Sequence, residues 1–91
     1  MIVATENFYI TSDEKVLSGE PIIKDTRTSV RAIVELYRLG ISPEELPTHL
    51  PHLNLAQIFA ALSYYSDNTE KINEYILKNR VEENTPLPLN K

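Results

Sequence analysis

The sequence of 91 residues contains no cysteine, and this absence excludes disulfide bonds, thiolate metal sites and thiol nucleophiles. It has only two glycines, too few to build a glycine-rich loop that cradles a phosphate group. It also lacks a signal-peptide pattern at its N-terminus and an apolar run long enough to span a bilayer. We therefore expect a cytoplasmic protein that has no membrane segment and needs no cofactor.

Positive charge is scarce as well, because the net charge is −4, which argues against a protein that coats nucleic acid by bulk electrostatics. Residues 21–43 nevertheless carry a net charge of +2. A surface that faces a polyanion is therefore expected at Lys24, Arg27 and Arg31, unless these side chains are simply solvated or paired with nearby carboxylates. For Arg27 we favour a structural role over a phosphate contact, since a guanidinium can tie a turn to the following helix.

Residues 19–31 combine a turn, a short strand, a second turn and the start of a helix. The strand at residues 22–23 is predicted to pair with a strand at residues 8–10, and so short a pair must lean on helices for stability. Asp25 lies in the second turn, where its short polar side chain tolerates a left-handed backbone.

Helix signals follow along the rest of the chain. Thr28 or Ser29 is expected to cap the first helix, and Gly40 to end it. Ser42 and Asn54 each have a capping-box partner three residues later, which predicts two further helix starts. The helices expected from these signals and from the apolar spacing span residues 29–39, 42–50, 54–65 and 70–79.

The predicted fold is thus mainly α: a small three- to four-helix domain of helix-turn-helix type, homeodomain-like or winged-helix-like, with a short N-terminal β-hairpin. We place this single domain at residues 1–80 and a flexible tail at residues 81–91. The tail has three apolar residues between polar ones and two prolines, a composition that suits either a frayed terminus or a segment that folds onto a partner.

The motif of residues 19–31, with the Gly40 stop and the Ser42-Pro43-Glu44-Glu45 helix start, resembles the bacterial family catalogued as domain of unknown function 433. The resemblance covers roughly residues 8 to 65. Two positions depart from the family pattern: Glu20 stands where a basic residue is usual, and Asp25 where a glycine is usual. If the basic residue of relatives contacts a phosphate, that contact is missing here.

The helix at residues 55–65 would be the recognition helix of a helix-turn-helix unit, yet it contains no arginine or lysine. A helix that is apolar nearly all round is buried, often against a second copy of itself. We therefore predict weak DNA binding that does not involve this helix. We also predict a homodimer, whose seam would contain Ile58, Leu62, Tyr65 or Ile72.

No enzyme is expected, because the sequence shows no combination of acid, base and nucleophile. His49 and His52 are separated by three positions with Pro51 between them, and no third ligand is near in sequence, so no metal site is predicted.

Three function classes follow. The family resemblance implies an antitoxin that binds a PIN-type nuclease toxin and its own operator DNA. The alternatives are a homodimeric protein-interaction module that does not bind DNA, and a stand-alone transcription regulator.

Overall fold

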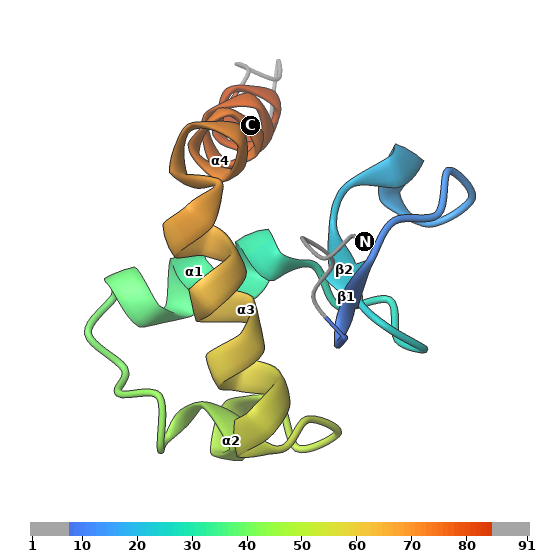
Figure 1. The fold of residues 1–91 in the computed structure, drawn as a ribbon. Helices are drawn as coiled ribbons and strands as arrows, with labels where there is room; N and C mark the ends of the chain where they lie inside the picture. The colour runs from blue at the N-terminus through green and yellow to red at the C-terminus, as the bar shows by residue number, and fades with distance from the viewer. Residues whose placement is uncertain (1–7, 85–91) are drawn as a thin grey trace.

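The protein is described by a computed structural model of residues 8–84, with side chains described as far as residue 80. A small two-stranded sheet and a left-handed turn, η1, stand beside a group of four helices (Figure 1). This arrangement confirms the mainly helical class with a short N-terminal hairpin. The elements in chain order are β1 (Ile10–Thr11), η1 (Leu17–Gly19), β2 (Ile22–Ile23), α1 (Val30–Arg38), α2 (Leu46–His49), α3 (Leu55–Asp67) and α4 (Thr69–Asn84).

The two strands pair antiparallel, with Ile10 opposite Ile23 and Thr11 opposite Ile22. The pairing confirms the predicted partners, although β1 begins at Ile10 rather than at residue 8. Ile23 has no exposed surface and packs in the main hydrophobic core. Through this side chain, β2 holds the sheet against the helices. Two strands of two residues each are not stable alone, and this packing against the helices stabilises them.

Helix α1 begins and ends as expected. The Ser29 hydroxyl accepts a hydrogen bond from the Ala32 N–H at 2.9 Å, which identifies Ser29 as the cap. Gly40 follows the helix with φ of 101°, a conformation that strains any residue with a Cβ. Between these ends, Val30, Ile33 and Val34 are fully buried on one face.

The start of α2 differs from the prediction. The helix begins at Leu46, preceded by a turn in which the Ser42 carbonyl accepts hydrogen bonds from the N–H groups of Glu45 and Leu46, at 2.9 and 3.2 Å. The predicted capping box at Ser42 is therefore wrong, because the helix begins four residues after Ser42, with Glu45 at its N-cap position. The capping box at Asn54 is confirmed, since the Asn54 side chain accepts from the Gln57 N–H and the Gln57 side chain accepts from the Asn54 N–H.

The core lies where α1 packs against α3 and α4, with α2 closing one end. In Figure 1, α3 runs in front of α1 and leads directly into α4. Helix α4 continues to Asn84, so the first residues of the segment predicted as a tail are helical, and residues 85–91 lie outside the described part. Since α2 is a single turn, the helix-turn-helix assignment stays a prediction. None of the helices within residues 8–84 is long and apolar enough to cross a membrane.

Candidate functional site

The turn that leaves β2 carries two of the three predicted nucleic-acid-binding residues. We call residues Lys24, Asp25, Thr26 and Arg27 the basic turn. The Ile23 N–H donates to the Thr28 carbonyl at 2.8 Å and so closes the turn at its base. Within the turn, Asp25 has φ of 65°, which confirms the left-handed conformation predicted for this position.

Thr26 holds the basic turn in one shape. Its hydroxyl donates to the Ile23 carbonyl at 2.8 Å and accepts from the Thr28 N–H at 3.0 Å. The backbone N–H of Thr26 also donates to the Ile23 carbonyl, at 3.0 Å. These bonds fix the backbone from which the two cationic side chains project, so a ligand would have to order only those side chains and not the turn itself.

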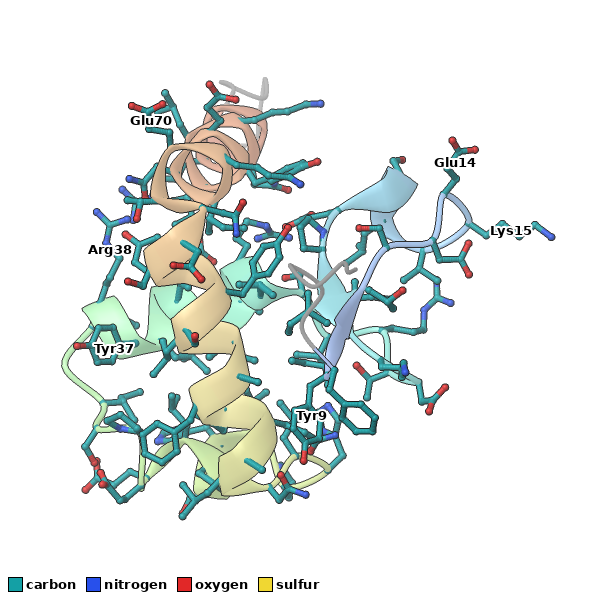
Figure 2. The ribbon with its side chains drawn as sticks, in the orientation of Figure 1. Tyr9, Glu14, Lys15, Tyr37, Arg38 and Glu70 are labelled. Carbon is teal, nitrogen blue, oxygen red and sulfur yellow. The ribbon has the colours of Figure 1, made fainter. Side chains whose placement is uncertain are left out.

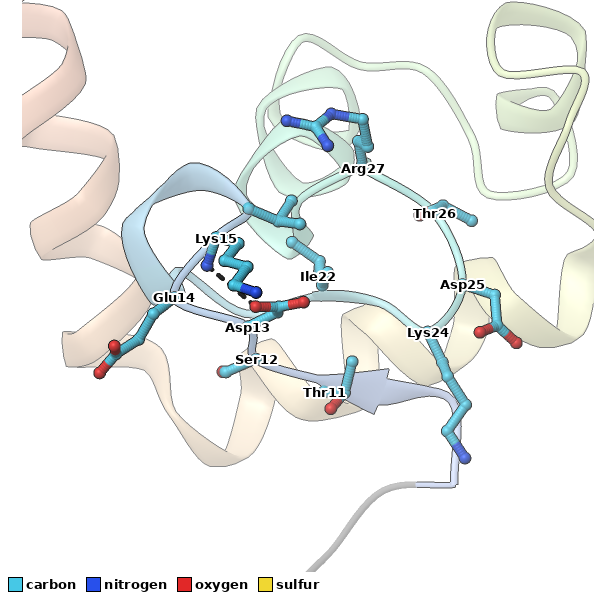
Figure 3. Close-up of a pocket in the computed structure, with 11 residues that line it drawn as sticks. Thr11, Ser12, Asp13, Glu14, Lys15, Ile22, Lys24, Asp25, Thr26 and Arg27 are labelled. Carbon is cyan, nitrogen blue, oxygen red and sulfur yellow. Dashed lines mark hydrogen bonds between the residues drawn. The ribbon is translucent and has the colours of Figure 1, made fainter.

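The basic turn forms one rim of an open hollow of about 820 Å³, and the loop after β1 forms the other rim. Figure 3 shows Lys24 and Arg27 at separate points around this hollow, with the Asp13 side chain between the two rims. Figure 2 shows Glu14 and Lys15 at the end of the hairpin that is farthest from the helices, both pointing outward. The lining holds three basic and three acidic side chains, so the hollow as a whole is not electropositive.

The two cations of the turn are in different environments. The Lys24 ammonium lies 4.9 Å from the centre of the Phe8 ring, a cation–π contact on the surface. The Arg27 side chain is exposed and makes no hydrogen bond or ion pair with any residue in the described range. The structural role that we favoured for Arg27 is therefore wrong within residues 8–84, because its guanidinium does not connect the turn to α1 by any hydrogen bond or ion pair there.

The third candidate, Arg31, is placed differently. Its Nε donates to Glu20 Oε2 at 2.7 Å, and its Nη1 lies 3.6 Å from Glu35 Oε1 one helical turn away. Only 15% of the Arg31 side chain and 5% of the Glu20 side chain are exposed. With two carboxylates beside it, Arg31 offers no unpaired charge to a phosphate, and we correct its assignment to a structural one. Glu20, the acidic residue at a position where the family pattern has a basic one, is therefore the buried partner of Arg31.

The predicted dimer seam also needs correction. Ile58 and Ile72 have no exposed surface and lie in the core of their own chain, so they are not available to a second copy. Leu62 and Tyr65 are half-buried against that core, and the Tyr65 hydroxyl donates to Asn73 Oδ1 at 3.2 Å. A homodimer stays a prediction, but Ile58 and Ile72 cannot lie on its surface, while the assignment of Leu62 and Tyr65 stays untested.

Sequence reasoning missed the exposed side of α3, because it assumed that the whole helix was buried. Leu55 is 41% exposed and Phe59 is 47% exposed. The sequence holds no signal that separates the two sides, because apolar residues lie on both, and only the packing shows which side the rest of the chain covers.

No cluster of three or more histidine or acidic side chains suited to a metal ion occurs among the described residues. His52 Nε2 lies 2.6 Å from the Thr28 hydroxyl and so joins the loop before α3 to the residue that follows the basic turn. His49 is exposed at the end of α2.

Comparison with known proteins gives one family. The family model described as protein of unknown function (DUF433) matches residues 10–65. A crystal structure of a DUF433 member protein from Anabaena variabilis superposes with a TM-score of 0.71 at 30% sequence identity, covering 80% of this chain and 71% of that one. No match was found among curated proteins.

Proposed function

The chain belongs to the protein family of unknown function DUF433, and we propose that it acts as the antitoxin of a toxin–antitoxin pair. In this proposal it binds a PIN-type nuclease and touches its own operator DNA through the basic turn. The partner class is supported by the family resemblance. The DNA contact is supported by one observation: the Arg27 guanidinium is exposed and unpaired within the described chain, on a turn whose backbone is fixed.

Helix α3 is a poor alternative for the DNA contact. It has no arginine or lysine, and its Gln57 amide oxygen is already accepting a 2.8 Å hydrogen bond from the Asn54 N–H in the capping box. A glutamine that reads adenine needs both its oxygen and its amino group free for the base edge. Gln57 would lose the cap to make that contact, so sequence reading by α3 is disfavoured.

The proposed DNA contact is weak. With Arg31 neutralised by Glu20 and Glu35, the basic turn offers Lys24 and Arg27, two phosphate contacts per chain. Each neutralised phosphate contributes about −0.9 to the slope of log affinity against log salt, so the expected slope is about −2 per chain. The net charge of −4 opposes binding further. Such a protein needs a partner, either the toxin or a second copy, to hold an operator at physiological salt.

Fluorescence anisotropy with a labelled duplex at low salt tests the DNA contact. Arg27→Ala should weaken binding about fivefold and reduce the salt slope by about one, because one phosphate contact is lost. Arg80→Ala is the matched control, since it removes the same charge from an exposed position on α4 and should have little effect. Equal losses in the two variants would mean that only total charge matters. A change of sequence preference in Gln57→Ala would show that α3 reads bases after all.

A second candidate function is a protein-interaction module that does not bind DNA. The observation in its favour is the uncharged, partly exposed side of α3 that carries Leu55 and Phe59. If no duplex binds at low salt, this becomes the better interpretation.

A further inference from the structure

One side of α3 is exposed and carries no charge. We define the α3 stripe as Leu55, Ala56, Phe59, Ser63 and Ser66, all of which are exposed. Their spacing of one, four, eight and eleven positions from Leu55 places them on a single face of the helix. The opposite face buries Ile58 and Ala61 in the core. The stripe is therefore a second, uncharged surface, separate from the apolar face that packs in the core.

The exposed faces of the neighbouring long helices are different. On α1 the exposed residues include Arg38, and on α4 they include Glu70, Lys71, Glu74, Lys78 and Arg80. Charged residues make up 24% of the sequence, yet the first acidic or basic side chain on α3 is Asp67 at its last position. An uncharged surface of this length gives a charged partner nothing to pair with, and it is complementary to another neutral surface.

We propose that the α3 stripe is the seam of a homodimer, in which the α3 helices of two copies cross antiparallel at Phe59. A second copy fits for two reasons. Each chain carries a net charge of −4, so two chains come together most easily on a face without charge. A two-fold axis also requires a surface that is complementary to itself, which a neutral stripe centred on one aromatic residue satisfies.

The antiparallel arrangement follows from the ends of α3. With Phe59 at the two-fold axis, Leu55 lies opposite the partner's Ser63, and Ala56 and Ser63 are small enough to let the helices approach closely. Asp67 then lies near the N-terminal end of the partner's α3, where the helix dipole favours a negative charge. A parallel arrangement would instead bring two Asp67 carboxylates together. The proposal uses no residue of the basic turn, so its test is independent of the proposed DNA contact.

The dimer should be weak and dependent on concentration. Stable interfaces bury about 800 Å² on each partner, and two large side chains that are already half-buried supply only part of that area. Sedimentation at rising concentration should therefore show a shift from the 10.4 kDa chain to twice that mass.

Phe59→Glu is the direct test, because it places two carboxylates together at the axis. Self-association should weaken at least about 100-fold, as expected for like charges forced into contact. Leu77→Glu is the matched control: Leu77 is 64% exposed on α4, and the same new charge there should leave the dimer intact. Unchanged circular dichroism in both variants separates dissociation from unfolding.

Cross-linking tests the geometry, since the wild-type chain has no cysteine. Leu55→Cys and Ser63→Cys in one chain should form a covalent dimer under mild oxidation, while each single variant should not. The two positions lie about 12 Å apart along one helix, too far for a disulfide within a chain. The proposal is overturned if the wild type stays at 10.4 kDa at every concentration, if Phe59→Glu dimerises normally, or if Phe59 proves to bind a different protein to a monomeric chain.

Discussion

The buried ion pair between Arg31 and Glu20 gives a sharp prediction about stability, because its two partners are not equivalent. Replacing Arg31 by methionine leaves the carboxylate of Glu20, whose side chain is 5% exposed, without its 2.7 Å partner. Replacing Glu20 by glutamine leaves Arg31 beside Glu35, and the new amide oxygen can still accept from Nε. The ion pair is lost in both cases, but only the first leaves a buried charge without a partner.

The magnitudes follow from burial. Removing one partner of a fully buried pair costs about 3–5 kcal/mol. Arg31→Met should fall at the lower end, about 3 kcal/mol, since its site has some access to water. Glu20→Gln should cost only about 1 kcal/mol, because the charge attraction is lost while the hydrogen bond from Nε is kept and Arg31 still has Glu35 beside it. In a domain of this size each kcal/mol lowers the melting temperature by about 4–8 °C.

Urea unfolding followed by far-ultraviolet circular dichroism measures both values, since the chain has no tryptophan to serve as a fluorescent probe. The double variant Glu20→Gln, Arg31→Met completes a cycle and should be less destabilised than the sum of the two single variants. Equal losses in the single variants would refute the account, because they would mean that Glu20 is not buried as a charge that depends on Arg31.

Two further predictions concern helix ends. Asn54→Ala removes the side chain that caps α3 and should lower the free energy of unfolding by about 1 kcal/mol in the same assay, whereas a loss below half that value would argue against the cap. Gly40→Ala should cost about 1 kcal/mol through backbone strain alone, because φ is 101° and an added Cβ would meet nothing within 4 Å. If Gly40→Asn, which adopts a left-handed backbone more easily, loses as much as Gly40→Ala, strain is not the cause.

Local signals predicted much of the fold. Ser29, Gly40 and Asn54 mark helix ends by chemistry that acts within four residues, and each was confirmed. The capping box predicted at Ser42 is wrong for an equally local reason. The Ser42 carbonyl closes a turn with the next residues, and the helix begins only after that turn.

Contacts between distant segments were harder to predict. The sequence shows that Arg31 and Glu20 are eleven positions apart, but only the packing of the hairpin beside α1 brings Nε within 2.7 Å of the carboxylate. The same limit applies to Phe59, because an apolar helix does not reveal which of its faces the rest of the chain covers. Lys24 and Arg27 are exposed, so their role in nucleic-acid binding stays a prediction, whereas Arg31 is paired with two carboxylates.

The proposed antitoxin role depends above all on the partner that the chain binds. This role is tested by affinity purification of the tagged protein from its native host, with identification of bound proteins by mass. We expect one co-purifying protein in a fixed ratio to the chain, identified as a PIN-type nuclease that the chain inhibits in a ribonuclease assay. Recovery of the chain alone, or with further copies of itself and no nuclease, would contradict it.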